Sequence, residues 1–353
     1  MKIKTLQGVM FAVLLAFGFV SPQITHALTI TPSRLELSGD PGTTVTEKMT
    51  VVNDQNVLGT YYSSYANFEA EGDTGTPALV EAKDDLGTWM STPDSIVVAP
   101  GGSKEVVIKI AIPKNATPGG HFAAIFWGTQ PTKNANKNIG IGAKTGMLVL
   151  LTVNGNIPEQ GGVTEFDTIG STHYFNALPI PFYYRFQNGG GDRINPSGDI
   201  LMKDMLGLTG AKVPGNPVDG NILPLSTRKF TTTWSGGAGE EGKLPKGFFA
   251  AANYELHNFA LGRYTAHLKL TYGSKGVVTD SVVHFVVWPW HLVVFVLILA
   301  FVIFLVVRYA VLHGEKWVVN KAEKMLEKDE EAKIEERVEE KLKEIEKEKE
   351  TKQ

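Results

Sequence analysis

An apolar stretch near the C-terminus constrains this 353-residue chain more than any other feature. From His291 to Val307 nearly every residue is aliphatic or Phe, and Trp288, Pro289 and Trp290 come directly before. Together these residues reach the roughly 20 that one bilayer-spanning helix requires. A buried helix of a soluble domain is a poor alternative for so uniform a run. The sequence therefore predicts a transmembrane helix over residues 288–310.

The residues on either side of this stretch predict its orientation. Trp288 and Trp290 suit the boundary between lipid and water, where amphipathic rings collect. Positive charges follow the span, and the positive-inside rule places them in the cytoplasm. They are Arg308, His313, Lys316, Lys321 and Lys324. We therefore expect a single-pass protein of the cell membrane, with the N-terminal domains extracellular and a cytoplasmic tail over 311–353.

Residues 1–27 have the pattern of a signal peptide. Lys2 and Lys4 precede an apolar run from Val9 to Val20, and Thr25-His26-Ala27 places small residues where signal peptidase reads them. We expect cleavage after Ala27. The alternative is an uncleaved N-terminal anchor, which is disfavoured because the apolar run is short for a bilayer core about 30 Å thick.

Composition excludes several classes of site. The chain has no cysteine, which rules out disulfides, thiolate zinc sites, a Cys nucleophile and an acylated lipoprotein Cys. The net charge of -3 gives no sign of nucleic-acid binding. The length leaves room for two ordinary domains between the targeting elements.

Residues 28–157 predict a first β-sandwich. In Ser103–Ile112, Val106, Ile108 and Ile110 share one face, because side chains alternate across a strand. Further strands separated by turn residues are expected at 28–32, 34–38, 43–52, 122–127 and 147–153, the last two as a pair joined by a polar loop over about 132–146.

Residues 163–287 predict a second β-sandwich. The Pro- and Gly-containing segment 154–162 looks like a hinge between the two modules. Near the end, 263–272 and 277–287 form a predicted hairpin whose last strand runs almost directly into the span. The predicted fold class is mainly β, with two tandem immunoglobulin-like or fibronectin-like sandwiches, one transmembrane helix and a charged cytoplasmic helix.

The tail after the span is dense in Glu and Lys and contains no Gly or Pro from 315 to 353. Acids such as Glu339 and Glu340 precede Lys343 by about one helical turn, so a continuous helix is expected. Its apolar residues form a sparse stripe. Self-association as a weak coiled coil and an isolated charged helix remain equal alternatives.

Five passages resemble a known family. Residues 87–113 and 116–126 resemble the N-terminal domain of the WxL-interacting proteins of Gram-positive bacteria, and residues 186–200, 223–230 and 261–273 are similar to the second domain of that family. The resemblance implies two immunoglobulin-like domains held at the cell surface. It also implies peptidoglycan association for the first domain and binding of a partner protein for the second.

Catalytic motifs are missing from the sequence. It contains no His-Glu-x-x-His pair, no Gly-x-Ser-x-Gly elbow and no phosphate loop. His121 and His173 are interpreted as ordinary surface or edge residues. The run Gly189–Arg193 is interpreted as a glycine turn between strands and not as a phosphate cradle. We therefore predict no catalytic residue, no cofactor and no metal site.

Two groups of side chains are candidates for binding. Tyr61, Tyr62 and Tyr65 alternate imperfectly along one strand and suit either sugar stacking or core packing, of which core packing is favoured. A group of acids, with Asp84 and Asp85 at its centre, could offer oxygen ligands to calcium. Its spacing fits no EF-hand loop, so a solvated turn is the favoured interpretation. The other two acids considered are Asp73 and Glu81.

These observations favour a non-enzymatic, membrane-anchored binding or scaffold protein of the cell surface. Its expected partners are the lipid bilayer and either peptidoglycan or another surface protein, with no nucleic acid. The alternative is a transmembrane sensor or assembly factor whose cytoplasmic helix recruits a partner. A hydrolase of envelope polymers is a distant third possibility.

Overall fold

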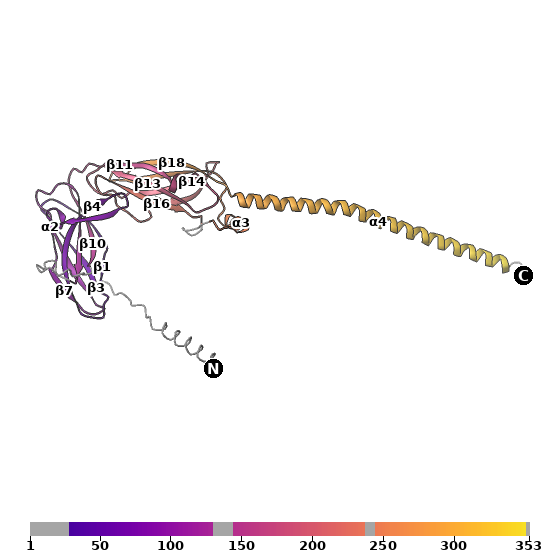
Figure 1. Ribbon diagram of the computed structural model, residues 1–353, viewed down its shortest axis with the longest axis horizontal. Coiled ribbons are helices and arrows are strands. Elements are labelled where there is room, and N and C mark those ends of the chain that lie inside the picture. The colour runs from indigo at the N-terminus through magenta and orange to yellow at the C-terminus, as the bar shows by residue number, and fades with distance from the viewer. Residues whose placement is uncertain (1–27, 130–143, 237–243, 351–353) are drawn as a thin grey trace, which may run out of the picture. The chain divides into compact units, whose positions relative to one another are not determined.

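The computed structural model of the chain describes residues 28–129, 144–236 and 244–350 (Figure 1). The predicted signal peptide and most of the predicted loop over 132–146 lie outside the described residues. Within them, the predicted fold class is confirmed: two β-sandwiches are followed by one long C-terminal helix with an apolar first part.

The first sandwich is built from two facing sheets. Its elements are β1 (Leu28–Thr31), β2 (Arg34–Gly39), β3 (Thr44–Asn53), β4 (Gly59–Glu71), β5 (Thr76–Glu81), α2 (Leu86–Trp89), β6 (Met90–Ser91), β7 (Ser95–Val98), β8 (Ser103–Ala111), β9 (Gly119–Gly128) and β10 (Lys144–Val153). One sheet has the strand order β1-β3-β8-β6. The other has the order β2-β10-β9-β4-β5, with β7 also paired to β4.

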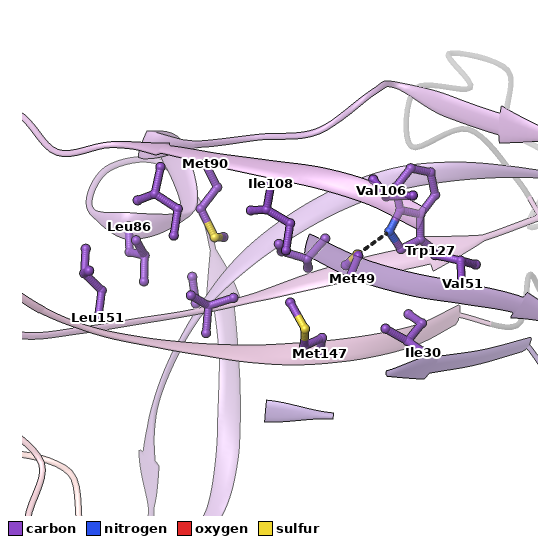
Figure 2. Packing of buried hydrophobic residues seen from close by; sticks show 14 of the residues in the cluster. Ile30, Met49, Val51, Leu86, Met90, Val106, Ile108, Trp127, Met147 and Leu151 are labelled. Atoms are coloured by element: carbon purple, nitrogen blue, oxygen red, sulfur yellow. Dashed lines mark hydrogen bonds between the residues drawn. The ribbon is translucent and has the colours of Figure 1, made fainter. Parts of the chain in front are cut away.

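The core between these sheets follows from the alternation along the strands. On β8, Val106, Ile108 and Ile110 are buried while their neighbours are exposed, as predicted. Across the core, the indole Nε1 of Trp127 donates to the Sδ of Met49 at 3.3 Å (Figure 2). Each fully buried aliphatic side chain, such as those of Val106, Ile108 and Ile110, contributes about 1.5–3 kcal/mol to the stability of the fold. The interior is therefore sufficient to hold the domain without disulfides.

Strand pairing agrees with the prediction in one place and extends it in another. The predicted pair over 122–127 and 147–153 is confirmed, because β9 and β10 are antiparallel. At the opposite edge of β10, β2 adds in parallel register, with Arg34 opposite Leu148. The N-terminal segment therefore joins both sheets: β1 pairs with β3 in one, and β2 pairs with β10 in the other.

The second sandwich also has two sheets. Its elements are β11 (Gly161–Thr168), η1 (Ile169–Ser171), β12 (Tyr174–Phe175), β13 (Ile180–Asn188), β14 (Ser197–Lys203), β15 (Thr209–Pro214), β16 (Ser226–Trp234), β17 (Gly262–Tyr272) and β18 (Val277–Val287). The strand orders are β11-β13-β16 and β12-β18-β17-β14-β15. Aromatic rings fill its interior: Phe186 meets Tyr272 edge-on at 5.1 Å between ring centroids, and Tyr184 stacks on Phe230 at 5.0 Å.

Hydrogen bonds connect the segment between the sandwiches, the predicted hinge, to the second sandwich. The backbone N–H of Gly191 donates to the carbonyl of Pro158 at 2.9 Å. The carboxylate of Glu159 accepts the N–H of Ser274, in the turn between β17 and β18, at 2.9 Å. These contacts tie the linker to two loops of the second sandwich.

The described residues divide into two compact units. The first holds most of both sandwiches, and the second consists of 173–180, 235–263 and the chain from 285 onward. The second unit contains α3 (Phe248–His257) and α4 (Trp290–Glu350), and α3 packs on the beginning of α4 (Figure 1). The sequence interpretation missed α3, because its short run of apolar residues lacks a clear period.

The predicted transmembrane helix and the predicted tail helix are one element. α4 continues without interruption from Trp290 to Glu350, whereas two consecutive helical segments were expected. It begins two residues later than predicted, at the position after Pro289, whose fixed φ and missing N–H suit a helix start. The expected pairing of an acid with a Lys one turn on is present between Glu339 and Lys343, at 4.0 Å.

Candidate binding site

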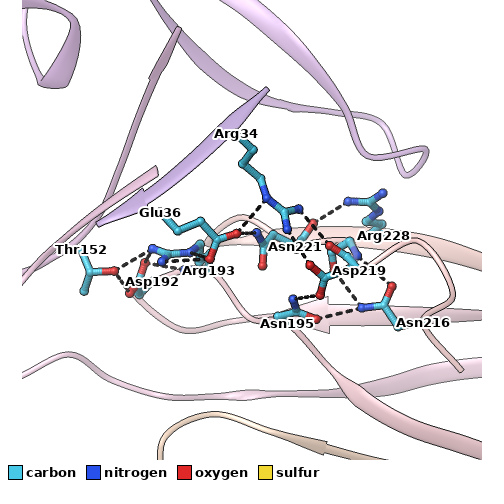
Figure 3. Close-up of polar contacts among 11 residues, drawn as sticks. Arg34, Glu36, Thr152, Asp192, Arg193, Asn195, Asn216, Asp219, Asn221 and Arg228 are labelled. Atoms are coloured by element: carbon cyan, nitrogen blue, oxygen red, sulfur yellow. Dashed lines mark hydrogen bonds and ion pairs between the residues drawn. The ribbon is translucent and has the colours of Figure 1, made fainter. Parts of the chain in front are cut away.

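Arg34 of β2 is the centre of a polar network that joins the two sandwiches (Figure 3). Its Nε pairs with Glu36 at 3.0 Å, and its Nη2 pairs with the carboxylate of Asp219 at 2.6 Å. Asp219 also accepts a hydrogen bond from the amide of Asn195 at 2.6 Å. The hydrogen bonds from Asn195 and Arg34 hold the pKa of Asp219 below its ordinary value, so this carboxylate stays charged.

Glu36 extends the network to two further groups of the second sandwich. Its carboxylate accepts a hydrogen bond from the Nδ2 of Asn221 at 2.8 Å and forms an ion pair with Arg193 at 3.3 Å. Arg193 also donates to the hydroxyl of Thr152 at 2.7 Å, and the same hydroxyl donates to Asp192 at 2.6 Å. Arg193 and Asp192 lie in the glycine turn between β13 and β14, so that turn docks one sandwich on the other.

A second set of contacts involves the β4–β5 turn. The carbonyl of Asp73 accepts the backbone N–H of Lys229 at 2.6 Å, and its carboxylate pairs with Arg185 at 2.9 Å. Arg185 also pairs with Glu165. Its hydrogen bonds with Asp73 and Glu165 raise the pKa of Arg185 above its ordinary value.

Between these contacts lies a cavity of about 90 Å³. The outer face of the β2-β10-β9-β4-β5 sheet forms one wall, with Phe68, Leu148 and Leu150, and Leu223 of the second sandwich faces it. Two cationic side chains, Arg34 and Arg228, also line the cavity. An apolar hollow with two guanidinium groups suits a ligand that combines a negative charge with apolar surface.

Arg228 lacks a full set of hydrogen-bond partners among the described residues. Its Nη1 donates to the carbonyl of Asn221 at 2.8 Å, whereas its buried Nε has no hydrogen-bond partner among the described residues. The Oδ1 of Asn221 is also buried and unpaired there. Burial lowers the pKa of Arg228 below its ordinary value, and the charge of Arg34 adds to this. Leaving a buried donor unpaired lowers stability by about 1–3 kcal/mol. An anionic ligand that accepted a hydrogen bond from this Nε would remove that penalty.

Two glycines make room for the Arg228 guanidinium. A Cβ on Gly75 would overlap it, and a Cβ on Gly220 would lie 2.7 Å from its Cζ. Gly75 also has φ of 78°, a left-handed conformation that favours glycine. The ring of Phe230 lies 5.1 Å from the guanidinium carbon. The cation is therefore held in a fixed place at the cavity.

The three tyrosines proposed from the sequence do not form one site. Tyr61 is 1% exposed and its hydroxyl donates to the Oδ1 of Asn53 at 2.6 Å, so the structure favours core packing for this residue. The hydroxyl of Tyr65 is hydrogen-bonded to Thr92 at 2.7 Å, and its ring packs against the core. Tyr62 is half-buried.

The interpretation of His121 as a surface or edge residue is wrong, because it lies on the inner strand β9. His121 is 8% exposed and bonds to the carboxylate of Asp85 and to the carbonyl of Thr117, the latter at 2.8 Å. Its partner Asp85 was one of the candidate calcium ligands. The other acids have separate partners as well: Glu81 pairs with Lys83 at 3.0 Å, and Asp73 with Arg185. Among the described residues no group of three or more acids and histidines could hold a metal ion.

Of the three residues predicted to lie at the membrane boundary, Trp288 comes two residues before α4, Trp290 is its first residue, and Arg308 lies within it. Trp288 and Trp290 are 53% and 44% exposed, and the ring of Trp290 stacks on His291 at 3.7 Å between centroids. Arg308 follows a run of exposed aliphatic residues. α4 is the one helix in the described part of the chain that is long and apolar enough to cross a membrane, with a mean hydropathy of 3.1 in its most apolar window.

The comparisons with known proteins return structures but no named family. No family model and no curated protein matches the chain. Solved structures similar to it include the class 5 fimbriae chaperone CfaA, with 11% identity, a TM-score of 0.37 and coverage of 74% of this chain and 99% of that one. The E. coli chaperone DraB is also similar, with 13% identity, a TM-score of 0.34 and coverage of 74% of this chain and 95% of that one. The Pseudomonas aeruginosa CupB2 chaperone has 9% identity, a TM-score of 0.32 and coverage of 73% of this chain and 100% of that one. At these TM-scores the likeness carries no argument about activity or partner.

Proposed function

We propose that the protein is a non-enzymatic, membrane-anchored surface protein whose two sandwiches bind an extracellular partner at their junction. One observation supports the anchor above all others. β18 ends at Val287, and α4 begins at Trp290, with only Trp288 and Pro289 between them. The first part of α4 is apolar and exposed. A bilayer is the environment that such a surface requires.

The orientation follows from the sequence on either side of the span. The signal-peptide pattern of residues 1–27 and the basic residues after the span both place the sandwiches outside the cell and the tail in the cytoplasm. The resemblance to WxL-interacting proteins supports the same arrangement, and it supports either peptidoglycan or a surface protein as the partner.

The cavity beside Arg228 supports a partner that presents a carboxylate next to apolar surface. Both peptidoglycan stem peptides and protein segments carry such groups. The unpaired Nε of Arg228 would bind the carboxylate, and Phe68, Leu150 and Leu223 would contact the apolar part.

Anchoring is tested by expressing the full-length chain in a Gram-positive host. We expect it in the membrane fraction after carbonate extraction, with a single-cysteine variant at Val282 labelled by an impermeant maleimide on intact cells. A cysteine at Glu330 should be labelled only after lysis. A protein released by carbonate, or one labelled at both positions, would contradict the proposal.

Partner binding is tested with the same protein in nanodiscs, incubated separately with purified peptidoglycan and with surface-protein extracts. Retention on one of the two, reduced at least tenfold by Arg228→Gln and unchanged by Lys104→Gln, is the expected result. Lys104 is an exposed cation on β8, which makes its substitution a charge-matched control. Equal retention by both variants would contradict the cavity as the binding site.

The alternative function, a sensor or assembly factor, is favoured by one observation. α4 runs unbroken from the span to Glu350, so a rotation or displacement of the span would be passed directly to the tail. Deletion of residues 315–353 separates the two functions, since surface binding survives the deletion if the tail is passive, whereas recruitment of a cytoplasmic partner does not.

A further inference from the structure

A short helix with an exposed apolar face packs against the beginning of the proposed membrane span. Phe249 and Leu256 of α3 are 73% and 57% exposed. They are seven residues apart and so lie on the same side of the helix. Phe259 and Leu261, directly after α3, are also exposed, at 55% and 42%. Isolated exposed apolar side chains are common, but this many in one segment calls for a partner surface.

α3 is fixed to α4 by the side chains that it buries. Ala251, Ala252 and Glu255 are buried, and the carboxylate of Glu255 bonds to the Nδ1 of His291 at 2.6 Å and to the backbone N–H of Leu292 at 2.7 Å. This carboxylate satisfies one of the N–H groups that every helix leaves unpaired at its N-terminus. The orientation of the exposed face of α3 is therefore set by the helix that enters the bilayer.

The apolar surfaces of the two helices are continuous. Phe249 meets Phe295 edge-on at 6.3 Å between ring centroids. A groove formed with Phe248 and Phe249 continues along α4 past Ile298 to Val302. At a rise of 1.5 Å per residue, Phe295 lies about 7.5 Å along the axis beyond Trp290. Phe249 therefore lies at the same depth as residues of α4 that the bilayer must surround if α4 spans it.

The charges of the segment fit the same partner. Within 244–263 the acidic residue is Glu255, which is fully buried, while Lys246 and Arg263 on either side of α3 are exposed. The exposed formal charges of the segment are therefore all cationic, and cations at this level are attracted to anionic lipid headgroups.

We propose that α3 is an interfacial helix that inserts Phe249 and Leu256 into the outer leaflet of the membrane that α4 crosses, with acyl chains filling the groove between the two helices. The inference rests on the proposed membrane anchor. Its consequence is that the protein is attached at two points, a span and an interfacial helix locked to it by Glu255, which restricts the rotation of the extracellular part.

The absence of native cysteine allows a direct test with single-cysteine variants of the full-length protein, labelled with an environment-sensitive fluorophore in phosphatidylcholine–phosphatidylglycerol vesicles. Phe249→Cys and Leu256→Cys report the proposed lipid-facing side. Ala250→Cys and His257→Cys are matched controls, each exposed and rotated by about 100° on the same helix. Val302→Cys reports the span itself.

We expect blue-shifted emission at 249, 256 and 302, strong quenching there by bromine-labelled acyl chains, and severalfold weaker quenching by aqueous iodide than at 250 and 257. Water-like emission at 249 and 256 with a lipid-like signal at 302 would overturn the inference and leave the anchor intact. Water-like emission at 302 would overturn both. A blue shift at 249 and 256 that disappears when the protein is diluted in lipid would show a second copy in the groove, and would also overturn it.

Discussion

The carboxylate of Glu255 on α3 accepts the backbone N–H of Leu292 at 2.7 Å, in the first turn of α4. Glu255 is fully buried, and its other oxygen bonds to His291. A side chain of one helix thus caps the helix that follows the last strand, although 36 residues separate Glu255 from His291. The beginning of α4 is held by a specific bond and not only by chain connectivity.

Glu255→Ala is expected to release α3 from α4. Two hydrogen bonds to a buried carboxylate are lost, each worth about 1.5–3 kcal/mol, and the N–H of Leu292 is left unpaired. We predict cleavage near Lys246 at a much lower trypsin concentration for the nanodisc-embedded variant. Glu255→Gln, which keeps an acceptor for Leu292, serves as the control and should lie between the variant and the wild type. Equal cleavage of all three proteins would show that the contact does not stabilise α3.

Arg193→Ala is expected to weaken the junction between the sandwiches. The variant loses the bonds to Thr152 and Glu36, and charge-assisted bonds of this kind contribute about 1.5–3 kcal/mol. We predict that urea unfolding of the purified protein, followed by Trp fluorescence, changes from one transition to two as the sandwiches uncouple.

The matched control for Arg193→Ala is Lys48→Ala, which removes an ion pair to Glu105 whose members are both largely exposed. Exposed pairs contribute about 0–1 kcal/mol, so a single, barely shifted transition is expected. Two transitions in both variants, or in neither, would argue against a junction that depends on Arg193.

Tyr61→Phe is expected to lower stability without affecting binding. The hydroxyl of Tyr61 loses its bond to Asn53, and a neutral buried hydrogen bond contributes about 0.5–1.5 kcal/mol. We predict a decrease of this size in the free energy of unfolding and unchanged retention of the partner. Weaker retention at unchanged stability would instead revive the interpretation of Tyr61 as a ligand-binding residue.

His121 is expected to make stability depend on pH. Burial, the largest single effect, lowers the pKa of His121, but the hydrogen bonds to Asp85 and Thr117 and the charges of Asp85 and Asp192 raise it above its ordinary value of 6.5 in sum. A group whose pKa is raised by folding stabilises the folded state most when it is protonated. This contribution is fully present below about pH 6.5 and is lost as the pH rises through the raised pKa.

The measurement is the free energy of unfolding between about pH 5 and pH 9, the range in which a histidine changes charge. The wild type should become less stable toward high pH. His121→Gln removes the titrating group and should give a flatter profile over the same range. Parallel profiles for the two proteins would assign the pH dependence to other groups.

Local patterns along the chain predict several of the strands, among them β8, β9 and β10, and the long apolar helix. The alternation of Val106, Ile108 and Ile110 predicts a strand with one buried face because the geometry of a strand has a period of two. The uniform apolar run after Trp290 predicts a spanning helix because a bilayer core has a fixed thickness. α3 was missed because it is short and its burial is decided by α4, which lies about 40 residues further along the chain.

The contacts of the candidate site were outside the reach of local patterns. Arg34 and Asp219 are 185 residues apart in sequence, and nothing near either residue indicates the other. Sequence patterns predict a surface or edge position for His121 because its strand neighbours do not reveal Asp85, which contacts it from another part of the chain. The cavity beside Arg228 depends on Gly75 and Gly220 approaching from two different loops.

Local sequence patterns are enough to predict a mainly β chain with turn residues between its strands, a long apolar helix and a charged C-terminal segment. These properties depend on the geometric repeat of each backbone type and on whether each face meets water or an apolar environment, and both can be read from about 10 to 20 consecutive residues. Tertiary contacts determine which charged groups pair, which donors stay unpaired and which side chain caps α4. These depend on side chains brought together by packing, across separations that no local period encodes.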